Sequence, residues 1–310
     1  MIVTIGTFDG FHRGHQTLLQ RAYTRAIESG TTWGVITFRM MTGFKDFKSL
    51  FTQKEQMTLE KFFAIPVVHR IDFTYEISNM APPEFLDFIG ESLGVTGIVI
   101  GRDFKFGKDR AGDAWFLEYE CPVRGWSIDT LPVLKTNIGM PLGSTGIRSA
   151  VTYGRLEHVA ELLGYPYFCQ GVVIHGDDRG STLGFPTANF EISKEKVEVR
   201  RGVYSTLVFV GGNWYIGAAN IGVNPTFPGS RSKHIEVNLL GYEGQLYGEE
   251  LTIFLLSHIR DEIRFGNVEK LKNQVTLDIR RIREIAEESM KSYPDFWHRM
   301  GCAIAAVPPI

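Results

Sequence analysis

The feature that most constrains the fold of this chain is a glycine-rich string near its start, residues 6–15, which reads GTFDGFHRGH. It follows an apolar run at residues 2–5 and precedes an amphipathic run at residues 16–29. This order predicts a strand, a tight turn and a helix. Because the unpaired N–H groups at a helix N-terminus attract anions, such a turn is typical of a site for a polyphosphate.

The chemistry of the string is carried by its glycines and its two histidines. Gly6 and Gly10 let the backbone approach a ligand closely, and His12 and His15 can donate hydrogen bonds to phosphate oxygens. Such donors stabilise the charge that develops when an α-phosphate is attacked. Two histidines at this spacing are, by themselves, more often a surface feature, so the functional interpretation depends on the whole string.

Composition limits the class of protein. A chain of 310 residues with 44% hydrophobic and 22% charged residues is ordinary for a globular protein of two domains. The net charge of −2, without a basic cluster, gives little support for a nucleic-acid partner. The three cysteines lack metal-site spacing and are odd in number, which favours a reducing cytoplasm. No apolar run is long enough to span a membrane.

Residues 1 to about 165 alternate between strand and helix patterns. Strands are predicted at residues 33–38, 67–71 and 97–100, and helices at residues 53–65 and from Pro83. This alternation predicts a Rossmann-like α/β domain, with a parallel sheet covered by helices on both faces. Ligands of such sheets bind at the carboxyl ends of the strands, so the functional motifs should gather there.

Two further motifs follow this pattern. Residues 101–110 come directly after a predicted strand and contain Asp103; they imitate a P-loop, but the spacing of their glycines is wrong. Residues 144–148 open a helix, where Ser144 and Thr145 suit a cap and Arg148 suits a phosphate. Taken alone, the first motif would be a solvated loop and the second an ordinary helix cap.

The second half of the chain has a different pattern. Strands at residues 168–174, 203–210, 214–221, 234–240 and 251–257 predict an antiparallel barrel, followed by a helix at residues 267–289. Residues 184–190 read GFPTANF, in which Thr187 and Asn189 lie on one side of an extended segment and offer oxygen ligands to a hard cation. Glu236 alternates with apolar neighbours, so it faces away from them.

Together these strings resemble the bacterial bifunctional riboflavin kinase/FAD synthetases, and the resemblance covers nearly the whole chain. Residues 6–15 are similar to the signature of the adenylylating domain, and residues 101–110 and 144–148 are similar to its nucleotide-binding loops. The GFPTAN string is similar to a highly specific segment of riboflavin kinases. The resemblance implies an FMN adenylyltransferase domain at residues 1–165 and a riboflavin kinase barrel with a C-terminal helix at residues 166–310.

The resemblance also implies roles for individual residues. ATP for adenylylation would contact Gly6, Phe8, Asp9, Gly10, His12, His15, Asp103, Ser144, Thr145 and Arg148. ATP for the kinase would contact Gly176, Gly184, Pro186, Thr187 and Asn189, of which the last two would bind Mg²⁺. Glu236 would be the base that deprotonates riboflavin, and Arg260 would contact the flavin. The implied ligands are riboflavin, FMN, FAD and ATP, with no nucleic-acid or membrane partner and an oligomeric state that the sequence leaves open.

One departure from the family pattern keeps alternatives open. Residues 38–42 read FRMMT, where the family usually carries F-x-P-H-P. Loss of two prolines loosens this loop, and ordering it on binding costs conformational entropy, so we expect adenylylation to be the less efficient step. This departure supports the alternative of a riboflavin kinase with a weakened or lost adenylyltransferase and a flavin-binding or regulatory N-terminal domain. A second alternative is a nucleotidyltransferase for another phosphorylated acceptor, with the barrel as an accessory, and the GFPTAN string and Glu236 argue against it.

Overall fold

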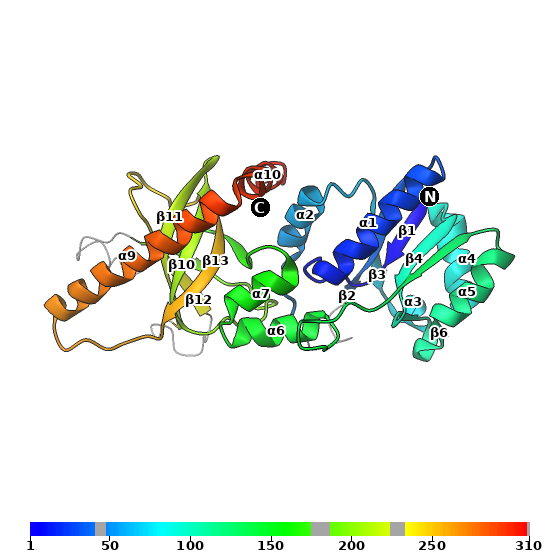
Figure 1. Ribbon diagram of the computed structural model, residues 1–310, viewed down its shortest axis with the longest axis horizontal. Coiled ribbons are helices and arrows are strands. Elements are labelled where there is room, and N and C mark those ends of the chain that lie inside the picture. Colours follow the sequence, from blue (N-terminus) through cyan, green and yellow to red (C-terminus); the bar gives the residue numbers. More distant parts are fainter. Residues whose placement is uncertain (41–47, 175–186, 224–232, 309–310) are drawn as a thin grey trace. The chain divides into compact units, whose positions relative to one another are not determined.

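The computed structural model describes residues 1–40, 48–174, 187–223 and 233–308. Contacts divide the chain into two compact units (Figure 1). The first unit consists of Met1–Phe47 and Phe63–Gly143, and the second of Lys48–Phe62 and Ser144–Ile310. The contacts therefore group residues 48–62 and 144–165 with the second unit, while the functional boundary near residue 165 stays a prediction.

The first unit contains a five-stranded parallel sheet, as the alternating pattern predicts. Its strands are β1 (Ile2–Ile5), β2 (Trp33–Met40), β3 (Val68–Phe73), β4 (Gly97–Gly101) and β7 (Ser127–Leu131). Their order is β3-β2-β1-β4-β7, and every pair is parallel. The chain order reverses on the two sides of β1, so the carboxyl ends of β1 and β4 flank the crevice where α/β sheets bind ligands.

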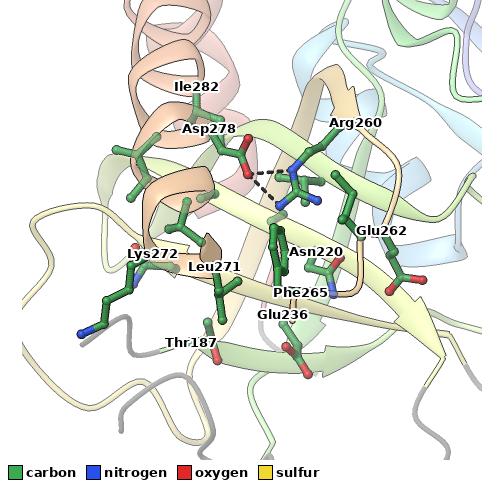
Figure 2. Close-up of a pocket in the computed structure, with 17 residues that line it drawn as sticks. Thr187, Asn220, Glu236, Arg260, Glu262, Phe265, Leu271, Lys272, Asp278 and Ile282 are labelled. Atoms are coloured by element: carbon green, nitrogen blue, oxygen red, sulfur yellow. Dashed lines mark hydrogen bonds and ion pairs between the residues drawn. The ribbon is translucent and has the colours of Figure 1, made fainter. Parts of the chain in front are cut away.

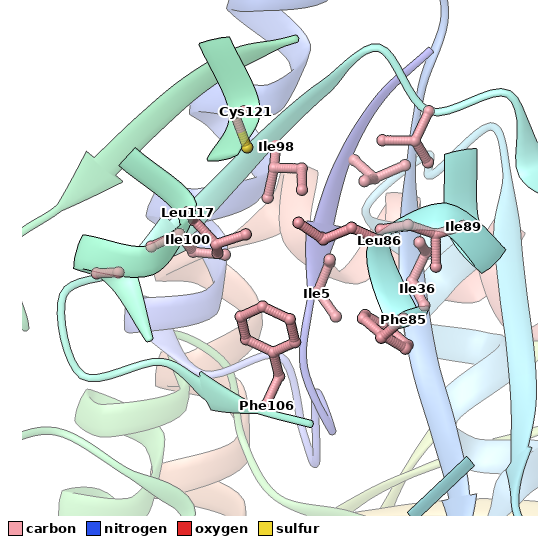
Figure 3. Packing of buried hydrophobic residues seen from close by; sticks show 13 residues of the cluster. Ile5, Ile36, Phe85, Leu86, Ile89, Ile98, Ile100, Phe106, Leu117 and Cys121 are labelled. Carbon is pink, nitrogen blue, oxygen red and sulfur yellow. The ribbon is translucent and has the colours of Figure 1, made fainter. Parts of the chain in front are cut away.

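Helices cover both faces of this sheet. The main ones are α1 (Arg13–Glu28), α4 (Pro82–Leu93) and α5 (Ala114–Val123); short elements are α3 (Tyr75–Asn79), η1 (Lys108–Arg110), β5 (Lys105–Phe106) and β6 (Gly112–Asp113). Val3 and Ile5 pack against α4 and α5 in the larger core, of which Figure 3 shows Ile5. Ile2 packs against Ala22 and Ala26 of α1. Because β1 is buried on both faces, three of its four residues are apolar, and all four are buried.

The second unit contains the predicted antiparallel barrel. Its strands are β8 (Phe168–Val172), β9 (Ala188–Glu191), β10 (Gly202–Val210), β11 (Asn213–Val223), β12 (Lys233–Leu239) and β13 (Glu250–Arg260). They are ordered β8-β13-β10-β11-β12-β9, with antiparallel pairing throughout. Beyond β8, the Ile174 N–H donates to the Asn189 carbonyl at 2.8 Å, which joins the two outer strands and nearly closes the sheet.

In the part of the chain that the structure describes, the helices of this unit are α2 (Gln53–Phe62), α6 (Ser144–Thr152), α7 (Leu156–Leu163), α9 (Val268–Ser292) and α10 (Pro294–Ala305). The predicted helix α9 packs against β10, β11 and β13. The sequence analysis did not predict α10, which begins at Pro294, directly after α9 ends. Its Trp297 ring lies 5.0 Å from Trp214 and 5.2 Å from Phe254, so α10 packs onto the barrel.

A buried ion pair fixes α2 to the barrel. Lys196 and Glu55 are 3% and 0% exposed, and the Lys196 ammonium donates to the Glu55 carboxylate. The same ammonium donates to the Phe168 carbonyl at 2.9 Å. Glu55 also accepts from the backbone N–H groups of Thr52 and Gln170, at 2.7 and 2.8 Å. Both charges thus have the partners that a buried ion pair requires.

We predict that Lys196→Met destabilises the protein by about 3–5 kcal/mol, because it leaves the Glu55 carboxylate buried without its cation. Adding Glu55→Gln should recover part of the loss, since it removes the buried charge and its amide oxygen still accepts from one of the two backbone donors, which contact different carboxylate oxygens. Urea-induced unfolding of the parent, the single variant and the double variant measures both effects. A single variant as stable as the parent would show that the pair does not hold α2 in place.

Candidate functional sites

The turn between β1 and α1 has an unusual backbone. Phe8 and Phe11 have φ angles of 45° and 38°, in the left-handed region that bulky residues rarely adopt. Gly10, between them, has a φ of 84°. The two phenylalanines are each 1% exposed, and their rings stack with centroids 5.6 Å apart. Burial of both rings stabilises a backbone conformation that costs energy, as is common at ligand-binding turns.

This turn presents the two predicted histidines as a stacked pair. His12 caps α1, because its Nδ1 accepts from the His15 backbone N–H at 3.3 Å. In the neutral ring the proton therefore lies on Nε2, which is a hydrogen-bond donor. The ring centroids of His12 and His15 are 3.6 Å apart, and the ring planes differ by 15°. A Cβ on Gly14 would lie 3.1 Å from His12 Cε1, so glycine leaves room for the stack.

Burial keeps both imidazoles neutral. It lowers the pKa of His12 from the ordinary 6.5 to about 4. It also lowers the pKa of His15 well below the ordinary value, and the neighbouring charge of His12 lowers it further. A negatively charged phosphate would act in the opposite direction, since an opposite charge favours the protonated ring. The pair can thus offer N–H donors to a polyphosphate and take up a proton when the ligand arrives.

The other residues predicted for adenylylation occupy three places. Phe8 packs against His15 with centroids 4.8 Å apart, and Asp9 is 5% exposed, so both support the turn from inside. Gly6 lies against the Phe8 ring, which a Cβ would approach to 3.4 Å. Asp103 is exposed just beyond β4, at the same edge of the sheet as the histidine turn. Ser144, Thr145 and Arg148 lie in the first turns of α6, in the second unit.

A cavity of about 590 Å³ lies beside the barrel sheet and α9 (Figure 2). Its apolar lining includes Val203, Phe265, Leu271, Val275, Ile279 and Ile282, and its polar lining includes Thr187, Asn220, Glu236, Arg260, Glu262 and Lys272. The cavity therefore contains three of the residues predicted from the sequence: Thr187, Glu236 and Arg260. An apolar cavity of this size with a few converging polar groups is typical of a small-molecule site.

Strand pairing arranges polar side chains in a row along this site. Glu236 of β12 lies opposite Asn189 of β9 on one side and opposite Asn220 of β11 on the other. Directly opposed residues of antiparallel strands point to the same face. The sequence analysis missed Asn220, whose only signal was a polar residue at an alternating position in an apolar strand.

Arg260 is held by the helix that faces the sheet. Its Nε and one terminal nitrogen donate to Asp278 Oδ2 at 2.8 and 2.7 Å, as Figure 2 shows. The other Asp278 oxygen accepts from Gln274 at 2.9 Å. The guanidinium carbon lies 5.8 Å from the centroid of the Phe265 ring. Asp278, 5% exposed, is a second residue that the sequence pattern did not single out; it holds the predicted flavin contact from the buried face of α9.

A second cavity, of about 200 Å³, shares Thr187 with the first. Tyr242, Leu246 and Tyr247 line it, together with Val237 from β12. Thr187 thus borders both cavities. The remaining residues predicted for this site, Gly176, Gly184 and Pro186, lie outside the described residues.

The donor atoms near Glu236 suit a hard cation. Thr187 offers a hydroxyl oxygen and Asn189 an amide oxygen, and the Glu236 carboxylate lies in the neighbouring strand position. Oxygen ligands of this kind fit Mg²⁺, which keeps several waters or phosphate oxygens of its own. In the part of the chain that the structure describes, no three His, Cys, Asp or Glu side chains could hold a metal together.

Family models and relatives match this architecture. A model described as FAD synthetase matches residues 1–142, and one described as riboflavin kinase matches residues 163–286. A bifunctional riboflavin kinase/FMN adenylyltransferase of Pseudomonas fluorescens is 33% identical over 295 residues, covering 93% of this chain and 94% of the relative. The chain belongs to the bifunctional riboflavin kinase/FMN adenylyltransferase family.

Other proteins are similar over nearly the whole chain. The Escherichia coli K12 protein of that description is 32% identical over 290 residues, covering 91% of this chain and 92% of its own. A crystal structure of a Streptococcus pneumoniae protein described as a macrolide-efflux protein has a TM-score of 0.83 and 28% identity. It covers 91% of this chain and 93% of that one.

Within the described residues, no helix is long and apolar enough to cross a membrane.

We predict that His12 titrates at about 4 in the ligand-free protein, because its ring is buried. Saturation with ATP should raise this pKa, since the phosphate charge favours the protonated ring. The measurement is a pH series of histidine ring NMR spectra, with His12→Asn to assign the signal; asparagine keeps a side-chain cap on α1. A His12 signal that titrates near 6.5 and does not respond to ATP would contradict the buried, phosphate-facing pair.

Proposed function

We propose that this chain makes flavin cofactors in two steps, with the barrel site phosphorylating riboflavin and the histidine turn adenylylating the product. The chain is a riboflavin kinase and an FMN adenylyltransferase. The observation that carries the residue assignment is the placement of Glu236 in the wall of the large cavity, opposite Asn189 and near Thr187. A carboxylate, a hydroxyl and an amide oxygen there provide a base and phosphate-side ligands at one place.

In the kinase step, the apolar part of the large cavity would receive the flavin ring, and Glu236 would meet the ribityl 5′-hydroxyl. The Glu236 carboxylate takes the proton of that hydroxyl. The hydroxyl oxygen attacks the γ-phosphorus of ATP, and ADP leaves. Thr187 and Asn189 would hold Mg²⁺ together with the ATP phosphates. When bound, this ion supplies charge that offsets the charge on the transferred phosphoryl group. Arg260, fixed by Asp278, orients the flavin.

In the adenylylation step, the FMN phosphate attacks the α-phosphorus of a second ATP and pyrophosphate leaves. His12 and His15 would donate to the phosphate oxygens from the N-terminus of α1, where the helix dipole also favours negative charge. Asp103 lies at the same edge of the sheet and would contact the nucleotide. Ser144, Thr145 and Arg148 would bind phosphate from the start of α6. Positioning and charge stabilisation supply most of the rate in such a transfer.

The two proposed sites divide the two activities between the two parts of the chain. We assign adenylylation to residues 1–165 and riboflavin phosphorylation to residues 166–310. The alternative of a weakened adenylyltransferase rests on the altered segment 38–42, of which residues 41 and 42 lie outside the described residues. We assign the protein to the cytoplasm, since Cys121, Cys169 and Cys302 are all free thiols.

We predict that Glu236→Gln lowers riboflavin phosphorylation by roughly 10²- to 10⁴-fold, the usual effect of losing a general base. Adenylylation of supplied FMN should persist, because Glu236 belongs to the barrel. Separating the flavins after incubation with riboflavin or FMN and Mg-ATP measures both activities. Glu287→Gln, at a surface position of α9, is the matched control. Equal loss of both activities in Glu236→Gln would contradict the assignment.

A second prediction concerns the stacked histidines. The double variant His12→Ala, His15→Ala should lower FAD formation from FMN by at least roughly 10²-fold, because two donors to the phosphates are removed. Riboflavin phosphorylation should stay at the parental rate. His158→Ala, which changes an exposed histidine of α7, is the control. If the double variant makes FAD at the parental rate, the turn has a structural role only.

A further inference from the structure

A histidine contacts the proposed base of the kinase site. His234 lies two residues before Glu236 on β12, so both side chains point to the same face of the strand. The His234 Nε2 atom is 3.2 Å from Glu236 Oε1. The side chain of His234 is 14% exposed and that of Glu236 is 38% exposed. The pair thus has an enclosed histidine behind a carboxylate that lines the large cavity.

We propose that His234 is a positioning residue for riboflavin phosphorylation, which holds the Glu236 carboxylate in the orientation that accepts the substrate proton. The proposal rests on the function proposed above for Glu236. It adds a residue that acts through the base and has no contact of its own with the reacting atoms.

The direction of the hydrogen bond supports this role. An ionised carboxylate can only accept, so Nε2 of His234 carries the proton and donates to Oε1. The second carboxylate oxygen, Oε2, then remains for the hydroxyl of the substrate. A glutamate side chain has three rotatable bonds, and fixing them before the substrate arrives removes an entropic cost from the reaction.

Neighbouring strands flank His234 on both sides. It lies opposite Glu191 of β9 and opposite Gly222 of β11. A Cβ on Gly222 would lie 3.0 Å from Glu262 Oε1 and 3.9 Å from His234 Cε1, so both side chains approach the space that this glycine leaves open. Among the residues that the structure describes, the charged groups near the ring are Glu236 on its own strand, Glu191 on β9 and Glu262 after β13. A donor among three carboxylates is well placed to orient one of them.

The chain contains a matched control pair. His158 and Glu161 on α7 are also 3.2 Å apart, but their side chains are 47% and 66% exposed. An exposed pair of this kind contributes little, because water competes for both partners. Comparing the two pairs separates the effect of the enclosed site from the effect of losing a histidine.

The experiment uses the full chain with His234→Leu, which removes the donor, and His234→Gln, whose amide nitrogen can replace Nε2. We expect kcat for riboflavin phosphorylation to fall roughly 10- to 100-fold in His234→Leu, as when a catalytic group loses its orientation. The KM values for riboflavin and ATP should stay within about twofold, because His234 binds neither substrate. His234→Gln should recover a large part of kcat, and His158→Leu should match the parent.

Combination with Glu236→Gln tests whether His234 acts through the base. The double variant His234→Leu, Glu236→Gln should be no slower than Glu236→Gln alone, since residues that act as a unit are not additive. Adenylylation of supplied FMN should be unchanged in every variant, and urea-induced unfolding should show a folded barrel in each. A parental kcat in His234→Leu, no recovery in His234→Gln, or additive losses in the double variant would each overturn the proposal.

The same data separate this proposal from the function on which it rests. If Glu236→Gln is slow but His234→Leu is as fast as the parent, Glu236 keeps its role and only the positioning role fails. If Glu236→Gln itself phosphorylates riboflavin at the parental rate, the base assignment is wrong, and the positioning role is wrong with it.

Discussion

The barrel site depends above all on the hydrogen-bonded register of β12 between β9 and β11. This register places Glu236 opposite Asn189 and Asn220 and turns all three toward one face. If the pairing of β12 slipped by one residue, Glu236 would point into the core and Val237 into the large cavity. Burial of Ile235 and Val237 therefore fixes the register that builds the site. The chemistry of the site is thus a consequence of the packing on the opposite face of the same strand.

In the first unit, the candidate site lies at the end of a buried strand. The chain leaves β1 through a turn with two left-handed phenylalanines and enters α1 at His12, which serves as helix cap and as candidate phosphate donor. Burial lowers the pKa of both rings, and the neighbouring charge of His12 lowers the pKa of His15 further. The same residues therefore stabilise the turn and prepare neutral donors at the edge where the sheet order reverses.

The sequence was sufficient for the sheet types, because strand periodicity and the alternation of strands with helices are local properties. It also singled out Thr187, Glu236 and Arg260, which the structure brings to one cavity. Two kinds of feature were missed for physical reasons. The helix α10 is held by tertiary packing of aromatic rings onto the barrel, and Asp278 acquires its partner only when α9 docks on the sheet. The chemical roles of all these residues stay predictions.

One chain performs two different phosphorus transfers in sequence, and the stoichiometry of its products is the sharpest measurement of this. Riboflavin and excess Mg-ATP would be incubated with the parent protein, with flavins separated chromatographically and phosphorus products followed by ³¹P NMR. The account predicts one ADP for every riboflavin converted and one pyrophosphate for every FAD formed, with FMN as the intermediate. FAD that forms without an equal amount of pyrophosphate, or riboflavin that is consumed without ADP, would contradict it.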